Sequence, residues 1–499
     1  MTTENTVTDT RLSSIAANGR LYINGSWQEA ADGGRIDVLN PATGQAIATV
    51  ASGTTADIDA AVSAARTAFE SGAWSLLSGR ERSRVLARAS AIMREREDEL
   101  ALAESLDVGK PITFAHVVDV ATAADQYEYV AAMAQQLDGS VRETPLAAHA
   151  FTRREPLGVV AAITPFNFPL ILSSSKIAAA LAAGNTVVHK PATDTPLTAL
   201  IMADILTEAG LPRGVFNVVT GPGGLLGDHL VGHPGISKVA FTGSTEVGAH
   251  VAALAGQKLR PVTAELGGNA ANILFADANL DKAIGTVISA FVFNSGQFCM
   301  GGPRLLVERP IYETVLEILA QAVPGVPLGD PLDPQTVIGP MASRKQLDKV
   351  ASHVEAARSA GGRIITGGEP LELNRGYFYK PTVIADLPND AAAVQEEIFG
   401  PVLTVQPFDT EAEAIHLANS TEYGLASGVQ TSSISRAHRV SAALDAGIVW
   451  VNAWGMLDPA VPFGGVKSSG WGREYGPESL DSYTRTKSVI IAIDAEDQA

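Results

Sequence analysis

Apolar, β-rich runs alternate with helical stretches from about Gly158 onward, and this alternation constrains the fold more than any other feature of the sequence. The expected strands are Val159–Ile163, Thr186–His189, Val215–Val219, Lys238–Phe241 and Pro261–Glu265. Helices such as Pro196–Ala209 and Thr245–Leu254 lie between them. Because helical crossovers join parallel strands and cover both faces of a sheet, the pattern predicts a mostly parallel α/β sheet.

A second series of the same kind begins near Asn272, with a strand to Phe275 and a helix over Leu280–Phe293. Its later strands are expected near Val383, Val402, Gly428 and Val449. A chain of 499 residues is too long for one compact core, so two α/β units are expected. Amphipathic, alanine-rich stretches at Ile58–Ala68 and Arg80–Asp107 predict helices packed on the first unit.

The overall charge argues against nucleic acid and membrane partners. Lys plus Arg number 36 and Asp plus Glu 54, and the resulting net charge of −18 repels phosphate backbones and anionic membrane surfaces. The most apolar stretch, Leu157–Leu172, is shorter than the roughly 20 residues of a membrane span. Residues 1–18 lack the basic start and apolar run of a signal peptide, and they are expected to form a flexible arm.

Cys299 is the single cysteine of the sequence. One cysteine excludes internal disulfides and thiolate zinc clusters, which fits a reducing compartment and predicts a cytoplasmic protein. It lies in the loop Phe293–Cys299, which contains Gly296 and directly follows an expected helix. Such loops commonly display reactive groups, whereas an arbitrary free cysteine is more often buried and inert.

Two further residues could serve a reactive thiol. Glu265 ends an expected strand, and the glycine pair Gly267–Gly268 leaves room beside its carboxylate. An enclosed carboxylate can have a raised pKa and act as a general base, although a glutamate at a strand end is commonly a solvated charge. Asn167 stands between Pro165 and Pro169, where its amide could donate to an oxyanion or satisfy its own turn.

Several other positions bear on ligand binding. In Phe241–Gly248 a strand runs into a helix, and Ser244 either caps that helix or marks a phosphate site at its start. The G-x-G-x-x-G fingerprint of a standard Rossmann site is absent. Lys190 follows a strand at the carboxyl edge of the sheet, where α/β folds bind ligands. His229 and His233 have helical spacing, but the absence of a nearby third ligand in the sequence argues against a metal site.

Taken together and in this order, the motifs resemble the aldehyde dehydrogenase superfamily. The matching segments are Pro165–Pro169, His189–Pro191, Phe241–Gly248, Glu265–Gly268, Gly296–Cys299, Glu396–Pro401 and Pro462–Gly465. The likeness spans essentially the whole chain from about residue 20.

The resemblance implies the reaction and the residues that perform it. Cys299 would be the nucleophile, Glu265 the general base, and Asn167 with the backbone N–H of Cys299 the oxyanion hole. Relatives that transfer the acyl group to coenzyme A usually lack the glutamate, so Glu265 favours release of a free acid through a thioester. A CoA-acylating or semialdehyde dehydrogenase of the same fold is the alternative, and a non-enzymatic role is disfavoured because neither nucleophile nor base is replaced.

The resemblance also implies NAD or NADP as cofactor. Lys190 and Glu397 would hold the riboses, Ser244 would contact the pyrophosphate, and Phe399 would lie near the nicotinamide ribose. The implied cofactor-binding residues are Thr164, Pro165, Phe166, Lys190, Thr193, Gly243, Ser244, Leu266, Glu397 and Phe399. Many NAD-preferring relatives carry a glutamate where this chain has Thr193, and a neutral hydroxyl leaves both cofactors open.

The expected substrate is an apolar aldehyde, aromatic or of medium chain length. The implied substrate channel is lined by Phe168, Leu172, Ser175, Phe298, Met300, Leu457 and Phe463, which form an apolar path without a cation. Relatives that act on carboxylated semialdehydes often have an arginine where this chain has Ser175.

The implied architecture is an α/β fold with a Rossmann-like cofactor domain, a second α/β catalytic domain and a small β oligomerisation element. The cofactor domain is expected over residues 19–135 and 156–266, and the catalytic domain over 267–475. Residues 136–155 and 476–499 would form the oligomerisation element, because Val141–Arg153 and Ser482–Ile493 are β-prone and detached from both series. A homo-oligomer, dimer or tetramer, is therefore expected.

Overall fold

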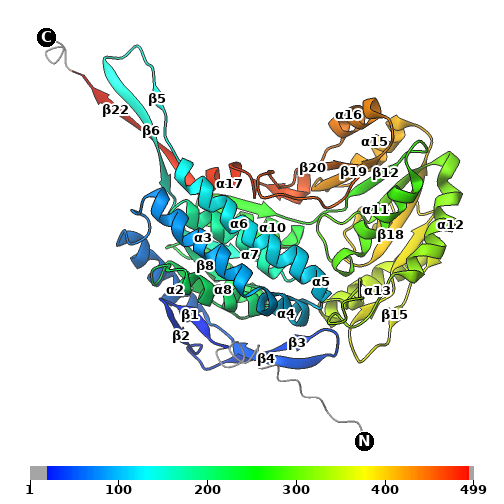
Figure 1. The fold of residues 1–499 in the computed structure, drawn as a ribbon, viewed down its shortest axis with the longest axis horizontal. Coiled ribbons are helices and arrows are strands. Elements are labelled where there is room, and N and C mark those ends of the chain that lie inside the picture. Colours follow the sequence, from blue (N-terminus) through cyan, green and yellow to red (C-terminus); the bar gives the residue numbers. More distant parts are fainter. Residues whose placement is uncertain (1–18, 494–499) are drawn as a thin grey trace, which may run out of the picture.

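The structure, a computed structural model, describes residues 19–493 and has two α/β lobes with a projecting arm (Figure 1). The flexible arm expected over residues 1–18 lies outside the described residues, as do the last positions of the expected oligomerisation element. None of the helices within residues 19–493 combines the length and apolar composition that crossing a bilayer requires.

The first lobe is built on an eight-stranded sheet with the order β2-β1-β9-β8-β7-β10-β11-β21. Its strands are β1 (Leu21–Ile23), β2 (Ser26–Gln28), β7 (Val159–Ile163), β8 (Thr186–Lys190), β9 (Phe216–Val218), β10 (Lys238–Thr242), β11 (Val262–Glu265) and β21 (Gly470–Trp471). The five central strands, β9 to β11, are parallel, as the sequence predicts, and the outer strands are antiparallel. The edge strand β21 comes from a part of the chain that the sequence analysis assigns to the second unit.

Both faces of this sheet are covered by helices, which explains why its strands are continuously apolar. On one face Val159 and Ala161 pack against α2 (Thr55–Glu70), α9 (Gly223–Gly232) and α10 (Thr245–Gly256). The intervening residues of β7 face a larger helical layer. That layer contains α3 (Gly79–Glu95), α4 (Glu97–Val108), α6 (Ala121–Met133), α7 (Pro169–Ala182) and α8 (Leu197–Glu208).

The stretch Arg80–Asp107, expected to be helical, forms two helices. A capping box of Ser78 and Glu81 starts α3, and the chain leaves helical geometry at Arg96, where φ is −103° and ψ 26°. The second helix, α4, ends at Gly109, whose φ of 84° is the left-handed conformation that glycine adopts without strain. Between α4 and α6, a π-helical turn over Ala115–Val120 brings that segment against the second lobe's cysteine loop.

The second lobe contains a seven-stranded sheet with the order β14-β17-β18-β13-β12-β19-β20. Its strands are β12 (Ala271–Leu274), β13 (Arg304–Glu308), β14 (Arg363–Thr366), β17 (Thr382–Ala385), β18 (Val402–Phe408), β19 (Ala426–Gln430) and β20 (Ile448–Val451). All are parallel except β14. The central strand β13 was not expected from the sequence. Its helices include α11 (Leu280–Val292), α12 (Tyr312–Ala322), α13 (Arg344–Ser359), α15 (Glu411–Asn419) and α16 (Ile434–Ala443).

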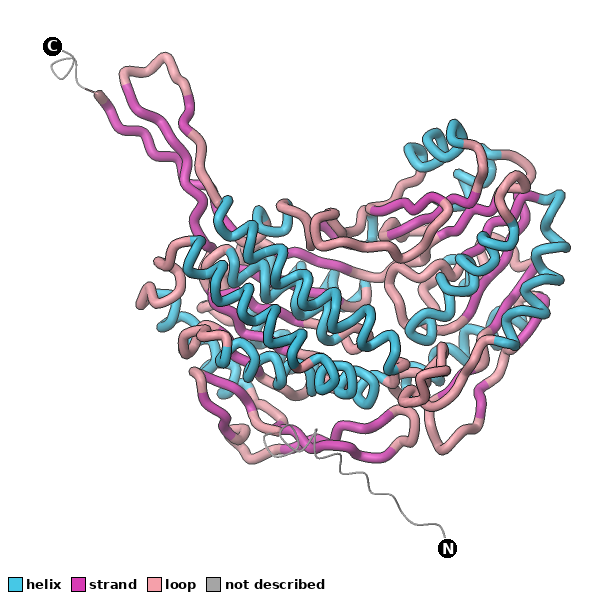
Figure 2. The backbone as a smooth tube through the Cα atoms, viewed as in Figure 1, coloured by secondary structure: helices cyan, strands magenta, loops and turns pink. Residues whose placement is uncertain are grey.

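The arm is a three-stranded antiparallel sheet of β5 (Val141–Arg142), β6 (Ala148–Pro156) and β22 (Thr484–Ala492), and it extends away from both lobes (Figures 1 and 2). Strand β22 pairs with β6 over its whole length, from Thr484 opposite Pro156 to Ala492 opposite Ala148. The two segments that the sequence shows as detached from both series therefore form one element.

Candidate active site

The carboxyl ends of the central strands open onto a cavity of about 820 Å³ between the lobes. This is the edge at which parallel α/β sheets bind ligands. All ten residues expected to bind cofactor line this cavity, and Lys345, Lys349 and His250, which the sequence analysis did not single out, line it too.

Lys190 and Thr193 lie at one part of this cavity. The Lys190 side chain is buried, and its Nζ donates to the carbonyl of Pro191 at 2.7 Å, which leaves two N–H groups for a ligand. Burial lowers the pKa of Lys190 to about 8. Thr193 Oγ1 donates to the carbonyl of Gly221 at 3.0 Å, so the hydroxyl is held at the cavity wall.

The N-terminus of α10 faces the same cavity through Gly243, Ser244 and Val247. The Ser244 hydroxyl accepts from the backbone N–H of Val247 at 3.4 Å and so caps the helix. The capping interpretation and the phosphate-site interpretation are therefore compatible, because the remaining N–H groups of the first turn stay available at the positive end of the helix.

Glu397 and Phe399 close the cavity from the second lobe. Glu397 Oε1 accepts from the backbone N–H of Gly268 at 2.9 Å. A Cβ on Gly267 would lie 2.7 Å from Glu397 Oε2, so the glycine is needed for this approach. Burial raises the pKa of Glu397 to about 7. Phe399 has a left-handed φ of 60° and packs edge-on against Phe166 across the lobes.

These features fit a dinucleotide. The cavity has the size of cofactor sites, and helix N–H groups suit a pyrophosphate. A buried lysine with spare donors and a partly buried carboxylate suit ribose hydroxyls.

A second cavity, of about 530 Å³, is predominantly apolar. Six of the seven residues expected in the substrate channel line it: Phe168, Leu172, Phe298, Met300, Leu457 and Phe463. The aromatic rings of Phe168, Phe293 and Phe298 contact one another with centroids 5.2 to 6.0 Å apart. Other lining residues that the sequence analysis missed include Val118, Thr122, Trp454 and Tyr475.

Ser175 departs from the expectation. It faces a very small cavity on the far side of Tyr475, with Gln126 and Tyr129, and its hydroxyl donates to Glu474 Oε2 at 2.6 Å. The family pattern predicts that this helical position points into the channel, whereas in the structure the Ser175 side chain points to the buried carboxylate of Glu474. It is Leu172, one turn earlier, that lines the channel.

Cys299 lines both cavities and therefore lies where they meet. The side chain is partly accessible, and burial, together with the charges of Glu397 and Glu265, raises the pKa of its thiol to about 12. A Cβ on Gly268 would lie 2.3 Å from the carbonyl oxygen of Cys299, so this glycine permits the close approach of the loop. The thiol is thus accessible from two sides and protonated at neutral pH.

Asn167 lies beside this loop. It is buried and lines the larger cavity together with Cys299. Its Nδ2 donates to the carbonyl of Gln297 at 3.0 Å, two residues before the cysteine. The amide has a second N–H, which is free for a ligand oxygen.

Glu265 is buried beside a charge network that the sequence analysis did not identify. Neither of its carboxylate oxygens bonds to a side chain within residues 19–493, whereas the backbone N–H of Gly465 lies close enough to lower its pKa. Burial, followed by the charge of Glu474, raises the pKa of Glu265 well above its usual range. Glu474 forms a buried ion pair with Lys176. A Cβ on Gly464 would lie 2.9 Å from Glu265 Oε1, so glycine makes room for the carboxylate.

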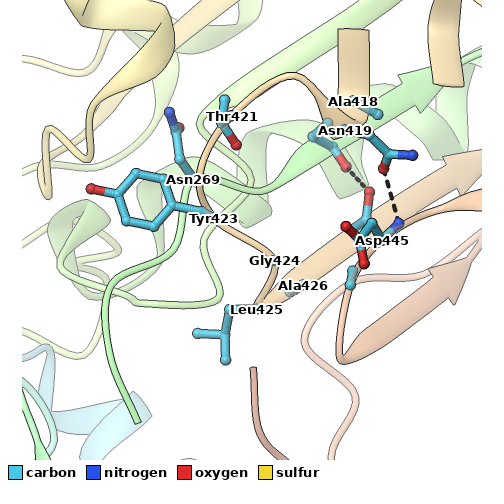
Figure 3. A pocket seen from close by; sticks show the side chains of 12 residues that line it. Asn269, Ala418, Asn419, Thr421, Tyr423, Gly424, Leu425, Ala426 and Asp445 are labelled. Atoms are coloured by element: carbon cyan, nitrogen blue, oxygen red, sulfur yellow. Dashed lines mark hydrogen bonds between the residues drawn. The ribbon is translucent and has the colours of Figure 1, made fainter. Parts of the chain in front are cut away.

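A small cavity of about 10 Å³, lined among others by Asn269, Asn419 and Asp445, holds at most about one water molecule (Figure 3). The side-chain oxygen of Asn419 accepts from the backbone N–H of Asp445 there at 2.9 Å. Nearby Asn269 donates to the carbonyls of Val394 at 2.8 Å and Glu396 at 3.4 Å, which supports the segment that carries Glu397. A cavity of this size is too small to hold a substrate or a cofactor.

His229 and His233 lie away from these cavities. His229 Nε2 is 2.6 Å from Asp59 Oδ1, and His233 Nε2 is 3.4 Å from the same oxygen. Over residues 19–493 there is no group of three or more histidine, cysteine or acidic side chains placed to hold a metal ion.

Comparison with known proteins gives the same assignment over the whole length. Residues 27–489 match the model of the aldehyde dehydrogenase family. An aldehyde dehydrogenase from Bacillus cereus, solved as an NAD⁺ complex, is 42% identical with a TM-score of 0.95, and the match covers 97% of this chain and 99% of that one. A betaine aldehyde dehydrogenase from Staphylococcus aureus in complex with NAD⁺ is 36% identical with a TM-score of 0.95, covering 98% of this chain and 97% of that one.

The chain has a dinucleotide-sized cavity at the carboxyl edge of a parallel sheet, and similar proteins have been solved with NAD⁺ bound. It is therefore an NAD(P)-dependent oxidoreductase. The chain belongs to the aldehyde dehydrogenase family.

Proposed function

We propose that this enzyme oxidises apolar aldehydes, aromatic or of medium chain length, to free carboxylic acids through a thioester on Cys299. The observation that carries the proposal is the position of Cys299, which lines both the cofactor-sized cavity and the apolar channel. An aldehyde that enters by the channel meets the thiol beside the cavity in which a dinucleotide fits.

The first step is addition of the Cys299 sulfur to the aldehyde carbon. Because the pKa of the thiol is about 12, the sulfur must lose its proton during attack. We propose that this proton leaves to water in the two cavities that Cys299 lines, so that Glu265 remains available for the second step. The free N–H of Asn167 and the backbone N–H of Cys299 would stabilise the alkoxide of the resulting thiohemiacetal. NAD(P)⁺ supplies the hydride acceptor and a positive ring charge.

The second step is hydrolysis of the thioester. Glu265 in its ionised form removes a proton from water, the hydroxide attacks the carbonyl carbon, and the C–S bond breaks. The proton then returns to the Cys299 sulfur and the acid leaves. Gly464, which makes room for the Glu265 carboxylate, supports this role. So does the lack of a side-chain hydrogen bond to that carboxylate within residues 19–493, because a carboxylate that no side chain anchors can reach water.

The channel supports an apolar substrate. Five phenylalanine rings line its walls, and Lys, Arg and His are absent from its lining. For the cofactor, Thr193 carries no charge that would repel a 2′-phosphate, so we propose that both NAD⁺ and NADP⁺ are accepted.

For the whole chain we propose a cofactor domain of residues 19–135 and 156–266, a catalytic domain of 267–475, and an oligomerisation element of 136–155 and 476–499. The separate sheets support this division, with β21 crossing from the second domain to the first sheet. We further propose a homo-oligomer in the cytoplasm, supported by the projecting arm and by the single cysteine, which suits a reducing compartment.

The test uses purified protein with a panel that includes benzaldehyde and aliphatic aldehydes, with each cofactor in turn. Reduced cofactor and free acid are expected from the wild type, and Cys299→Ala should abolish both. Glu265→Gln should form one equivalent of reduced cofactor and then stop, with the acyl group visible on Cys299 by intact mass. Acyl-CoA formation stimulated by coenzyme A, or normal turnover of Glu265→Gln, would contradict the hydrolytic mechanism.

A further inference from the structure

We infer that Asn294 is a positioning residue that joins the Asn167 turn to the Cys299 loop and thereby orients the Asn167 amide for the attack step. This inference rests on the proposed roles of Asn167 and Cys299. Asn294 does not line either of the two large cavities, so it would act through Asn167 and not on the substrate.

The side chain of Asn294 bridges the two segments. Its Nδ2 donates to the backbone carbonyl of Asn167 at 2.9 Å and to that of Gln297 at 3.2 Å. The Gln297 carbonyl also accepts from Asn167 Nδ2 at 3.0 Å. The two asparagines, which are 127 positions apart, thus share one acceptor, and each is held by the other's segment.

The Asn294 side chain can make this bridge because its own backbone is held in an unusual shape. Asn294 has a left-handed φ of 50° and ψ of 39° and is 1% exposed. The next residues are also fixed: Ser295 donates to the carbonyl of Gly339 at 2.8 Å, and Gln297 Oε1 accepts from the N–H of Ala342 at 2.9 Å. Strained backbone of this kind persists where the surroundings impose it, and it is frequent at functional sites.

The consequence for Asn167 follows from the planarity of an amide. One N–H of its Nδ2 is committed to the Gln297 carbonyl, so the direction of the other is determined by the position of that carbonyl. Asn294 sets this position from both sides, because it holds the backbone oxygens of both Asn167 and Gln297. Without Asn294, the Asn167 turn and the cysteine loop would lose a direct hydrogen bond, and the free N–H would be less precisely directed.

The main test is Asn294→Gly, because glycine adopts the left-handed backbone without strain and removes only the side chain. Single-turnover formation of reduced cofactor should fall about 10- to 100-fold, which is less than the roughly 100- to 1000-fold loss on removing an oxyanion donor itself, because the Asn167 amide is misdirected and not removed. The dissociation constant of NAD⁺ or NADP⁺ should change less than about twofold, since Asn294 lies outside the cofactor cavity. The matched control is Asn24→Gly, an exposed position with a left-handed φ of 52°, and it should keep the wild-type rate.

A second variant and a double-mutant cycle separate positioning from general loosening. Asn294→Asp keeps the size of the side chain but cannot donate to the two carbonyls, so its rate should fall at least as far as that of Asn294→Gly. In an Asn167→Ala background, Asn294→Gly should lower the rate further by less than about threefold, because the group on which it acts is gone.

The inference is overturned if both Asn294 variants react at the wild-type rate, or if the loss is equally large with and without Asn167. A wild-type enzyme that forms no reduced cofactor with any aldehyde would instead disprove the proposed function itself. The two failures are therefore distinguishable in one series of experiments.

Discussion

At the residue scale, the chemistry depends on how burial and neighbouring charges set the proton affinity of Glu265. A buried carboxyl beside a second carboxylate favours its neutral form. Since the pKa of Glu265 is raised by burial and then by Glu474, the base is protonated at low pH and becomes competent as pH rises. Hydrolysis of the thioester should accordingly increase with pH through this raised pKa.

We expect Glu474→Gln to shift this pH-dependent rise in the hydrolysis rate to lower pH. The substitution removes the negative charge that raises the pKa of Glu265, and it leaves the Lys176 cation, which lowers the same pKa. Both effects lower the pKa of Glu265. The measurement is the rate constant of acyl-enzyme hydrolysis from about pH 5 to 9, with folding checked by thermal unfolding, because a buried lysine loses its ion-pair partner.

The control is Glu478→Gln, four positions later and exposed, whose pH profile should coincide with that of the wild type. If the hydrolysis rate of Glu474→Gln rises over the same pH range as that of the wild type, Glu474 does not influence the base, or another group removes the proton from water.

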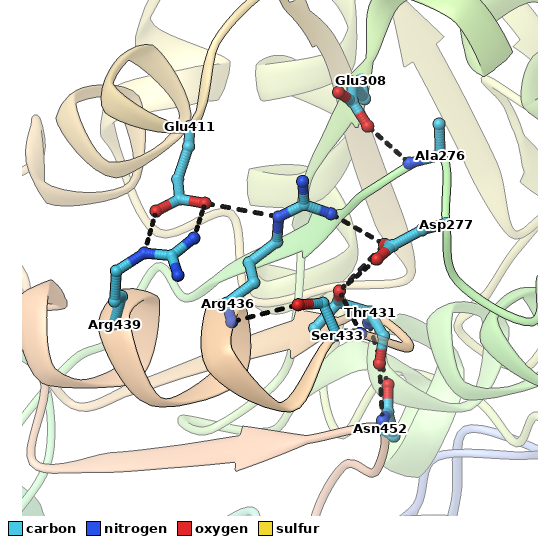
Figure 4. A network of polar contacts seen from close by, with 9 residues as sticks. All are labelled: Ala276, Asp277, Glu308, Glu411, Thr431, Ser433, Arg436, Arg439 and Asn452. Carbon is cyan, nitrogen blue, oxygen red and sulfur yellow. Dashed lines mark hydrogen bonds and ion pairs between the residues drawn. The ribbon is translucent and has the colours of Figure 1, made fainter.

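At the scale of secondary-structure elements, a polar network fastens α15 and α16 to the segments that directly follow β12 and β19 (Figure 4). Arg436 contacts Asp277 at 2.9 Å and Glu411 at 3.3 Å, and its guanidinium lies 4.3 Å from the centre of the Phe275 ring. Arg439 also binds Glu411, through two N–H groups at 3.1 and 2.9 Å. This side chain of Arg436 is three-quarters buried, so water screens its contacts only in part.

Arg436→Met should therefore destabilise the second lobe by about 1–2 kcal/mol, since methionine keeps the apolar stem but loses the charge-assisted bonds and the cation–π contact. For a protein of this size such a change lowers the unfolding midpoint by a few degrees. Differential scanning calorimetry measures the shift.

The matched control is Arg309→Met, which removes an exposed ion pair with Asp409 and should change the midpoint less. Equal shifts for the two variants would show that the network adds nothing beyond a surface ion pair.

At the scale of the whole molecule, the arm presents apolar side chains that the described chain does not cover. Val141 on β5 is 73% exposed. Ile490 and Ile491 are neighbours on β22 and point to opposite faces of the sheet, and they are 62% and 52% exposed. A narrow three-stranded sheet that leaves such residues in water is typical of a surface that pairs with another subunit.

Ile490→Lys combined with Ile491→Lys should lower the molar mass of the assembly in solution, because charged side chains cannot be buried in an interface without a large cost. Size-exclusion chromatography with light scattering measures it. The control is Ile434→Lys, which changes an exposed isoleucine on α16 of the second lobe and should keep the wild-type mass. A monomeric wild type would contradict the proposed role of the arm.

Much of the fold could be predicted because its signals are local. The five central strands of the first sheet begin and end within about two residues of their expected bounds, since a buried parallel strand is a short apolar run between turn residues. Strand β13 was missed because it directly follows the cysteine loop without a clear helix between them. The break at Arg96 was missed because the amphipathic pattern continues across it.

The placement of the site was predictable from motifs, whereas its supporting contacts were not. Cys299, Glu265 and Asn167 each stand in a recognisable segment, and the structure brings Cys299 and Asn167 to one cavity with Glu265 near enough to influence the thiol. Lys176 and Glu474 carry no local signal, because their ion pair joins positions that are 298 residues apart. The direction of Ser175 was likewise decided by that buried carboxylate.

The two α/β units, the single thiol and the segments that surround it are evident before folding is considered, because alternation, glycine and proline positions and motif order are properties of neighbouring residues. Tertiary structure alone decided which charges face Glu265, how Asn294 holds Asn167, and that β21 completes the first sheet. These depend on contacts between distant parts of the chain, whose distances and degree of burial come into existence only when the lobes pack together.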